Sequence, residues 1–141
     1  MTNASVELPV DYRPSDDEAF MNPLQMEYFR SRLLAWKKQI LGEAEATLNV
    51  LQMEQLREPD PNDRASHEAD WSVELRTRDR QRKLIAKIDA ALRRIEDGEY
   101  GYCEITGEQI SLRRLEARPV ATMTVEAQER HERREKLSRD G

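Results

Sequence analysis

The sequence has few of the residues that build a thick globular core. Aromatic residues make up 6% of its 141 residues, charged residues make up 36%, and Cys103 is its one cysteine. A single cysteine excludes an internal disulfide and offers at most one thiolate to a metal ion. So few aromatic residues in so charged a chain favour an elongated helical protein over a compact globule.

The chain also lacks any long apolar run. No stretch approaches the roughly 20 apolar residues of a membrane span, and the N-terminus lacks the basic start and apolar centre of a signal peptide. We therefore expect a cytoplasmic protein with no membrane partner. Glycine and proline are few, five and six residues, which leaves long stretches free to form helix.

Charge is unevenly distributed along the chain. The net charge of −5 argues against indiscriminate binding to nucleic acid. The first 20 residues carry five acidic side chains and one basic side chain, so we predict a disordered acidic tail over 1–21. Residues 76–87 instead carry six basic side chains and one acidic. That stretch is a candidate docking face for an acidic surface or a polyanion, unless it is simply a solvated helix face.

Two long helices are predicted between residues 22 and 97. Asn22 and Pro23 form a helix start, with Gln25 placed for a capping box, and no breaker follows before Glu58. Apolar residues along this helix follow coiled-coil spacing and form a seam: Met26, Phe29, Leu33, Trp36, Ile40, Ala44, Leu48 and Leu51.

The second helix, from about residue 65 to Asp97, carries a matching seam and ends at Gly98. We assign to that seam Trp71, Leu75, Ile85, Ile88, Leu92 and Ile95. Folding the chain back between them predicts an antiparallel hairpin. Its register sets Leu75 against Leu48 and Arg78 against Glu45, a charged layer within the seam.

The connecting stretch EPDPNDRA, residues 58–65, is predicted to form the tip loop of this hairpin. Pro59 and Pro61 stop the first helix, and Asp63 is placed to cap the second. Asp60 and Asp63 thus stand at the end of a long arm. They serve either the turn alone or a function that requires insertion into a partner's pore.

Residues 98–123 are predicted to form a small knuckle, followed by a C-terminal helix over 124–141. The turns at Gly101-Tyr102-Cys103 and Thr106-Gly107 have the outline of a zinc knuckle, but its second cysteine is missing. Cys103 with His131 as a nucleophilic pair lacks an oxyanion pocket. A metal site built from Cys103, His131 and a glutamate lacks a full ligand set. His67 is expected to be solvated.

Three motifs carry a family resemblance: PDPNDRA at 59–65, ELRTRDRQRKLIAKI at 74–88 and RRLEARP at 113–119. Together with the hairpin and the knuckle, they resemble the DksA family of bacterial transcription factors. The resemblance implies a mainly α fold, in which a long antiparallel two-helix coiled coil joins a small base domain with a zinc-finger-like knuckle and a C-terminal helix. It also implies a monomeric regulator that is not an enzyme.

The resemblance implies roles for named residues. Family members bind RNA polymerase at its secondary channel and do not contact promoter DNA. Asp60 and Asp63 match the family's tip aspartates and Ala65 its tip-flanking position, while Arg76 and Arg80 match the stretch that engages the channel rim. The family also binds the alarmone ppGpp at the shared interface, and Leu84, Lys87 and Arg118 match that site. Gln128 departs from the lysine of the best-known members, which predicts a weaker response.

The resemblance further implies where a zinc ion would be held. Zinc-binding members use four cysteines, and the corresponding residues here are Cys103, Thr106, Thr124 and Ala127. A hydroxyl or a methyl group cannot replace a thiolate, so we predict a knuckle with no zinc and no other cofactor. Apolar residues are expected to stabilise it instead: Ile105, Ile110, Leu112, Leu115, Val120, Met123 and Val125.

Three functional hypotheses follow. The first is a non-enzymatic regulator that inserts its tip into RNA polymerase and acts in the stringent response with ppGpp. The second is an assistant to transcript cleavage in the manner of the Gre factors, whose tip acids help hold a second Mg²⁺. The third is a coiled-coil adaptor without tip chemistry, for which Asp60 and Asp63 are replaceable.

Overall fold

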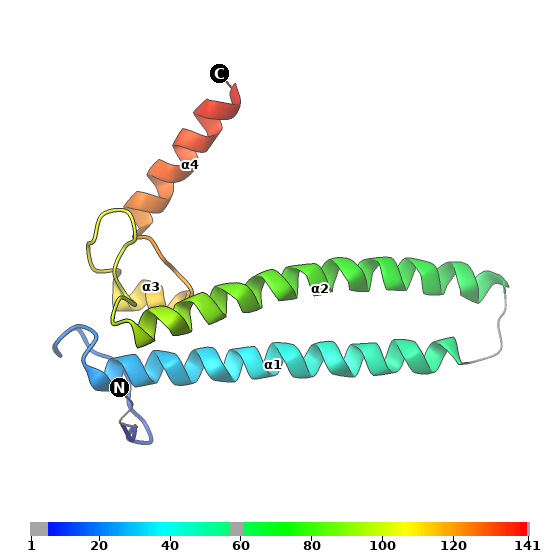
Figure 1. The fold of residues 1–141 in the computed structure, drawn as a ribbon, viewed down its shortest axis with the longest axis horizontal. Helices are drawn as coiled ribbons and strands as arrows, with labels where there is room; N and C mark the ends of the chain where they lie inside the picture. Colours follow the sequence, from blue (N-terminus) through cyan, green and yellow to red (C-terminus); the bar gives the residue numbers. More distant parts are fainter. Residues whose placement is uncertain (1–5, 57–60, 141) are drawn as a thin grey trace. The chain divides into compact units, whose positions relative to one another are not determined.

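The computed structural model describes residues 6–56 and 61–140, and the side chains of Gln55, residues 61–65, His67 and Asp140 lie outside the described part. Its helices are α1 Pro23–Gln55, α2 Pro61–Glu96, α3 Leu112–Ala117 and α4 Val125–Asp140 (Figure 1). Within the described residues there is no strand, and one isolated bridge pairs Tyr102 with Gln109. The prediction of a mainly α fold is confirmed.

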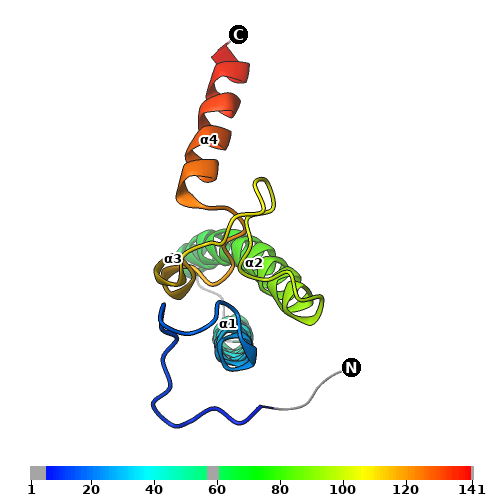
Figure 2. The same ribbon diagram turned by 90° about the vertical axis from the view of Figure 1, so that its left-hand side faces the viewer.

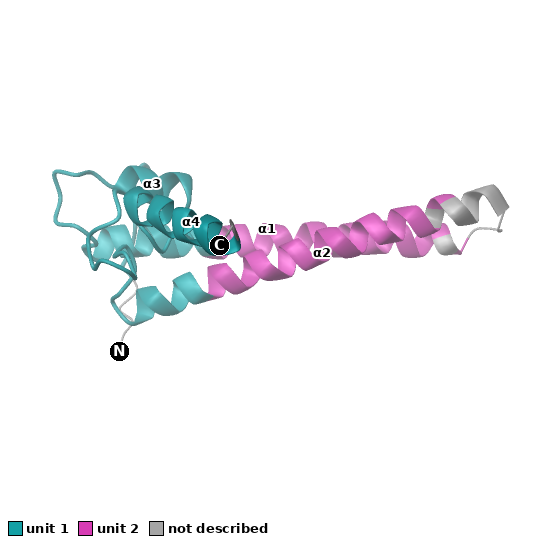
Figure 3. Ribbon diagram, turned by 90° about the horizontal axis from the view of Figure 1, so that it is seen from above, with its two compact units in different colours: residues 1–33, 90–141 teal, residues 34–89 magenta. Residues whose placement is uncertain are grey.

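The chain divides into two compact units, coloured separately in Figure 3. Residues 34–89 form the hairpin unit, which holds the outer parts of α1 and α2. Residues 1–33 and 90–141 form the base unit, which holds α3, α4 and the knuckle. Of the helices described, none has the length and apolar character needed to span a membrane.

Within the hairpin unit, α1 and α2 run side by side in opposite directions (Figure 1). An ion pair joins the two helices directly, with Lys37 Nζ 2.7 Å from Asp89 Oδ1. The predicted seam of α1 is confirmed at Ile40 and Leu51, which are buried. On α2, Ile88 is buried completely. The antiparallel hairpin predicted from coiled-coil spacing is therefore present.

The seam of α2 differs from the prediction at one position. Leu75 is 60% exposed, whereas the neighbouring Glu74 is 9% exposed and takes the inner position. The reason is that regular steps of three and four from Ile88 and Ile85 toward the tip lead to residues 81, 78, 74 and 71. The charged layer also differs, because Arg78 pairs with Glu74 on its own helix and Glu45 is exposed.

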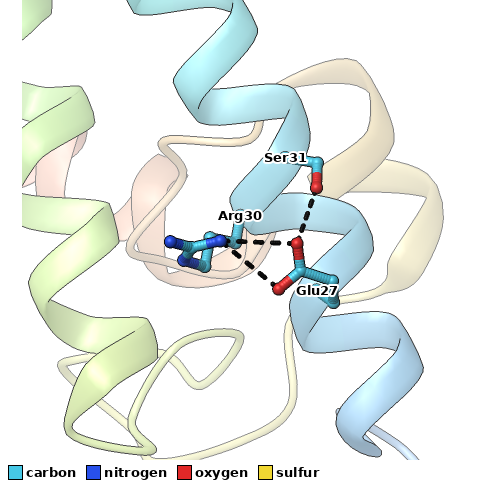
Figure 4. A network of polar contacts seen from close by, with 3 residues as sticks. All are labelled: Glu27, Arg30 and Ser31. Carbon is cyan, nitrogen blue, oxygen red and sulfur yellow. Dashed lines mark hydrogen bonds and ion pairs between the residues drawn. The ribbon is translucent and has the colours of Figure 1, made fainter. Parts of the chain in front are cut away.

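The start of α1 agrees with the capping prediction. Asn22 Oδ1 accepts a hydrogen bond from the Gln25 N–H at 3.0 Å, and Gln25 Oε1 accepts one from the Met21 N–H at 2.7 Å. Each bond satisfies a backbone donor that the helix itself cannot. In the following turn, the Glu27 carboxylate accepts hydrogen bonds from Arg30 and Ser31 (Figure 4). Contacts between residues three and four apart add to helix stability.

The tip loop is shorter than predicted. Helix α1 ends at Gln55, where the Leu56 N–H bonds Met53 O in a tightened last turn, and not at Glu58. Helix α2 begins at Pro61, because proline suits the first helical position. Asp63 therefore lies inside the first turn of α2 instead of capping it, and Ala65 also lies within the helix. Asp60 is outside the described residues.

A compact core holds the base unit together. Phe29, Tyr100, Ile110 and Leu115 are buried completely or almost so. The rings of Phe29 and Tyr100 lie 5.5 Å apart between centroids, and the Tyr100 hydroxyl donates to Pro119 O at 2.7 Å. Burial raises the pKa of the Tyr100 hydroxyl above its ordinary range. The chain enters this core from α2 through Gly98, whose φ of 75° ends the helix as predicted.

The N-terminal segment differs from the predicted disordered tail over residues 6–21. Tyr12 donates a hydrogen bond to Glu18 Oε1 at 2.8 Å, and the fully buried amide of Gln25 donates to Ser15 O at 3.2 Å. Burial, together with the Glu18 carboxylate, raises the pKa of Tyr12 to about 12. Phe20 packs edge-on against Tyr102 at 5.4 Å. In Figure 2 this segment lies beside the start of α1, so it is part of the base unit.

Candidate functional site

The knuckle is a tight double turn around Cys103. Backbone hydrogen bonds close it, from Cys103 N to Glu108 O at 2.7 Å and from Gly107 N to Cys103 O at 2.9 Å. Gly101 and Gly107 have φ angles of 93° and 75°, a region that favours glycine. Ring atoms of Phe20 and the Met21 side chain lie where a Cβ on Gly101 would point, so this glycine also permits close packing.

The Cys103 thiol is buried at the centre of this turn. Burial by itself raises its pKa, but hydrogen bonds to the sulfur outweigh that effect and lower the pKa to about 7. The donors are the Thr106 hydroxyl and the backbone N–H groups of Thr106, Thr124 and Ile105. The site thus stabilises a thiolate through N–H and O–H donors.

Thr106 and Thr124 have second tasks in the backbone around the thiol. Thr106 Oγ1 accepts a hydrogen bond from the Glu108 N–H at 3.2 Å. Thr124 caps α4, because its Oγ1 accepts from the Ala127 N–H at 3.2 Å and its carbonyl oxygen accepts from the Gln128 N–H at 2.9 Å. Ala127 is buried in the base core. Of the positions picked out from the sequence, the fold therefore brings Thr106 and Thr124 to the Cys103 sulfur.

Cys103 belongs to no cluster of three metal-binding side chains among the residues that the structure describes. Nowhere in this part of the chain do three His, Cys, Asp or Glu side chains come close enough to hold a metal ion. His131 is exposed on α4 and pairs with Glu135 on the same helix, with 3.1 Å between Nε2 and Oε1. The alternatives that combined Cys103 with His131 gain no geometric support.

The end of α2 and the knuckle share a pocket of about 410 Å³. Arg94 crosses it, donating to Tyr102 O at 2.7 Å and lying 3.9 Å from the Glu104 carboxylate. Cys103 and Glu99 complete the lining. The guanidinium ties α2 to the knuckle through a backbone carbonyl, so the pocket is polar and already internally bonded.

The predicted apolar residues of the knuckle are confirmed in part. Ile110, Leu112, Leu115 and Val120 are buried. The prediction is wrong for Ile105 and Val125, which are 63% and 45% exposed, and Met123 is half-buried. Ile105 follows Cys103 in the turn, where its backbone N–H bonds the sulfur while its side chain lies in solvent.

The basic stretch of α2 presents two arginines without an ion-pair partner among the described residues. Asp79 pairs with Arg82 at 3.3 Å and with Lys83 at 3.1 Å, which leaves Arg76 and Arg80 without a carboxylate. Arg80 donates only to Thr77 Oγ1, at 3.3 Å. Leu75 and Asp79 join these arginines around a shallow groove of about 420 Å³. The groove therefore offers positive charge beside an exposed apolar side chain.

The predicted effector residues fall in two units. Leu84 and Lys87 lie nearly one turn apart on α2 in the hairpin unit, and Lys87 is exposed. Arg118 is exposed at the C-terminal end of α3, and its N–H bonds Arg114 O at 2.7 Å. Gln128 donates to Glu132 Oε1 at 3.0 Å along α4. Both Arg118 and Gln128 belong to the base unit.

Fold and site together define a helical-hairpin protein whose base carries a knuckle of the zinc-finger type with one cysteine. Residues 25–95 match the family model described as DnaK suppressor protein DksA, N-terminal domain. Residues 98–133 match the model described as prokaryotic dksA/traR C4-type zinc finger. The chain belongs to the DksA family.

Characterised relatives extend this result. The RNA polymerase-binding transcription factor DksA of Caulobacter vibrioides is 67% identical over 130 residues, which cover 92% of each chain. The protein of the same name from Escherichia coli is 45% identical over 125 residues, covering 89% of this chain and 83% of the relative. Transcription factor DksA2 from Pseudomonas aeruginosa, a solved structure, matches with a TM-score of 0.76 and 39% identity over 83% of this chain and 90% of its own. These relatives are named as transcription factors, in agreement with the non-enzymatic prediction.

Proposed function

We propose that this chain regulates transcription by binding bacterial RNA polymerase at its secondary channel and directing the hairpin tip toward the active centre. The observation that carries the proposal is the 67% identity, over nearly the whole length of both chains, to a relative named for polymerase binding. The hairpin unit supplies two long antiparallel helices, and the base unit is a second compact unit.

Arg76 and Arg80 are the proposed contacts with polymerase. Both are exposed and lack an ion-pair partner within the described residues, and Leu75 beside them is exposed as well. Guanidinium groups with no internal carboxylate partner bind carboxylates of another protein without first breaking an ion pair. We infer that this face docks on an acidic protein surface, in preference to promoter DNA, because the whole chain carries a net charge of −5.

Asp60, Asp63 and Ala65 are proposed to act at the tip. The backbone places Asp63 and Ala65 in the first two turns of α2, the helix that leads away from the loop. A carboxylate there stabilises the helix N-terminus, and it also brings negative charge to the end of the arm. The isosteric change Asp63→Asn therefore tests this charge, because it keeps the size and polarity of the side chain.

ppGpp is proposed as an effector that binds where this protein meets polymerase. Lys87 and Arg118 supply the cations and Leu84 an apolar contact, as the family resemblance implies. Gln128 brings no charge, and its amide is already bonded to Glu132. We therefore expect a ppGpp response that Gln128→Lys strengthens and Lys87→Ala removes.

The base is proposed to work without zinc, although the chain matches a C4-type zinc-finger model. Zinc in a structural site of this type needs four ligands, and the residues at these positions offer one thiolate, two hydroxyls and one methyl group. Hydrogen-bond donors around Cys103 favour the thiolate without any metal ion, so the single thiolate does not depend on zinc for its stability. The residues of this chain do not fit the ion.

The test is transcription with purified bacterial RNA polymerase, with and without ppGpp, combined with competition binding at the secondary channel. Arg80→Ala is expected to weaken binding at least about tenfold, the usual size of losing one well-placed charged contact, without lowering the melting temperature. Glu68→Ala, on the exposed surface of the same helix, is the control and should bind normally. Undiminished competition by Arg80→Ala would remove this arginine from the interface.

Asp60→Asn and Asp63→Asn separate the three functional hypotheses. Regulation by the tip predicts near-normal binding and a lost transcriptional effect. Full regulation by both variants would leave an adaptor without tip chemistry. Stimulated transcript cleavage by the wild-type protein, lost in the same variants, would instead identify a cleavage factor of the Gre type.

A further inference from the structure

Polar side chains occupy the inner face of α2 toward the tip. The steps of three and four residues that place Ile85 and Ile88 inside the hairpin continue through an outer seam of Gln81, Arg78, Glu74 and Trp71. Glu74 is 9% exposed, while Leu75 beside it is 60% exposed. A carboxylate is thus buried next to a leucine that lies in solvent, which reverses the usual preference of the two residue types.

Hydrogen bonding in this outer seam is incomplete. The Glu74 carboxylate has its ion pair with Arg78, at 3.5 Å between Oε1 and Nε. Buried side-chain atoms that lack a hydrogen-bond partner, within the described part of the chain, include Trp71 Nε1, Arg78 Nε and Gln81 Oε1. Arg78 Nε still lies in the ion pair with Glu74, but Trp71 Nε1 and Gln81 Oε1 lose their bonds to water with nothing in return, so this layer weakens the closed hairpin.

The opposite end of the hairpin unit is built differently. Lys37 and Asp89 form an ion pair from one helix to the other at 2.7 Å. Ile40 and Ile88 are buried there, at 6% and 0% exposure. Toward the tip, α1 buries Leu51, at 9% exposure, but leaves Val50 and Met53 more than half exposed. The outer half of the hairpin therefore combines less apolar burial with more unsatisfied polar atoms.

A buried charged pair can also serve to fix the register of a coiled coil. That role requires a bond between the two helices, since only such a bond distinguishes one pairing from another. The Glu74 pair lies within α2, at residues four apart, so it is formed whatever α1 does. Lys37 and Asp89, in contrast, pair from one helix to the other, which is the geometry of a register contact.

We propose that the outer half of the hairpin, residues 41–55 and 66–81, opens locally while the rest of the hairpin unit stays closed. The outer seam is the joint of this motion, that is, the contact at which the two helices separate. Local opening follows from few buried apolar contacts and unsatisfied polar atoms in one contiguous segment. The functional role of this opening rests on the proposed function. An arm whose outer half yields can adjust the position of its tip, and of the arginines beside it, after the base has docked.

Hydrogen exchange of the free, full-length protein, followed by mass spectrometry, tests the opening without any partner. Amides in 66–81 should exchange at least about tenfold faster than amides in 84–89 of the same helix. Exchange at equal rates in the two segments would overturn the proposal. This comparison needs no variant, so it remains decisive even where a substitution fails to fold.

The variant Glu74→Leu/Gln81→Leu makes the outer seam apolar. It should slow exchange in 66–81 by about tenfold while leaving 84–89 unchanged, because Arg78 is partly exposed and can turn its guanidinium to water. The control Gln52→Leu/Glu68→Leu makes the same replacements at exposed positions of the same half and should leave exchange unchanged. Equal slowing by both variants would point to general hydrophobicity and contradict the joint.

Transcription with purified polymerase then tests the use of the opening. The stiffened variant should bind polymerase as the wild type does and lose at least about half of the regulatory effect, as activity that needs flexibility does. Full regulation by a variant with slowed exchange would overturn the functional use of the joint. Absence of polymerase binding by the wild-type protein would instead contradict the proposed function and leave the exchange result standing.

Discussion

Buried polar atoms are hydrogen-bonded more completely in the base unit than in the hairpin unit. In the base, the Tyr100 hydroxyl donates to Pro119 O, the Gln25 amide donates to Ser15 O and Glu18 Oε1, and nearby donors lower the pKa of the Cys103 thiol. In the hairpin, three buried side-chain atoms on α2 lack partners, against one in the base, Glu116 Oε1, within the described residues. The difference indicates that the base is built to keep one shape, and the outer hairpin to yield.

The largest effect on stability that this comparison predicts is the loss of a buried leucine of the base. Leu115→Ala in the base should cost about 2–5 kcal/mol of unfolding free energy, because Leu115 is buried completely. Leu75→Ala in the hairpin, the same change at an exposed position, should cost no more than about 0.5 kcal/mol. Urea unfolding of the two variants measures both. Equal losses would contradict the difference between the units.

Two glycines of the knuckle sharpen the same comparison at the backbone. Gly101→Ala should cost about 2–3 kcal/mol, since φ is 93° and the new Cβ would lie 3.0 Å from Met21 Cγ. Gly107→Ala has a similar φ of 75° but open space around it, so about 1–2 kcal/mol is expected. Thermal unfolding ranks the two, and a reversed order would mean that the N-terminal segment does not pack on Gly101.

The Cys103 thiol predicts a dependence of base stability on pH. Its pKa of about 7 in the folded protein lies below its ordinary value of 9.0. This contribution is therefore fully present above pH 9 and is lost as pH falls through 7, with a size of about 3 kcal/mol. Thiolate absorbance during a pH titration should show a midpoint near 7 that Cys103→Ser abolishes.

Thr106→Val tests the cause of this low pKa. Removal of the hydroxyl donor should raise the Cys103 pKa toward its ordinary value, whereas Thr122→Val, which removes a hydroxyl bonded to Glu104, should leave it unchanged. A midpoint that stays near 7 in Thr106→Val would mean that the backbone donors suffice without the hydroxyl.

The smallest effect is expected at the ion pair between the hairpin helices. Lys37 and Asp89 are each about one-third exposed, so Asp89→Asn should cost below about 1 kcal/mol, and added salt should reduce even that. Melting temperatures in low and high salt check this. A loss well above that value would show that the inner end of the hairpin depends on this single pair.

The sequence predicted the helices well because their signals are local. Asn22, Gln25 and Gly98 mark helix ends through their own backbone chemistry, and the fold uses them at those ends. Residue type alone did not predict that Glu74, and not Leu75, takes the inner position of α2. The regular spacing from the distant isoleucines sets the register of the helix, and it does so against the usual preference of leucine for burial.

Residues of the base were harder to predict because their partners are distant in sequence. Tyr100 bonds Pro119, and Phe20 packs on Tyr102, contacts that no periodic pattern announces. The acidic composition of residues 1–21 pointed to disorder, while Tyr12, Ser15 and Glu18 in fact bond one another and Gln25. One specific contact, the Phe20 ring against Gly101, helps to hold this segment in place although its average composition is typical of disorder.

Metal analysis of the purified protein tests most directly the claim that the base holds its shape by packing and hydrogen bonds alone. We predict no stoichiometric zinc, and a melting temperature that a strong chelator leaves unchanged, since no ion contributes to folding. The same protein should keep its regulatory activity in chelator. One tightly bound zinc per chain, lost together with the folded base on chelation, would contradict the account of residues 98–127.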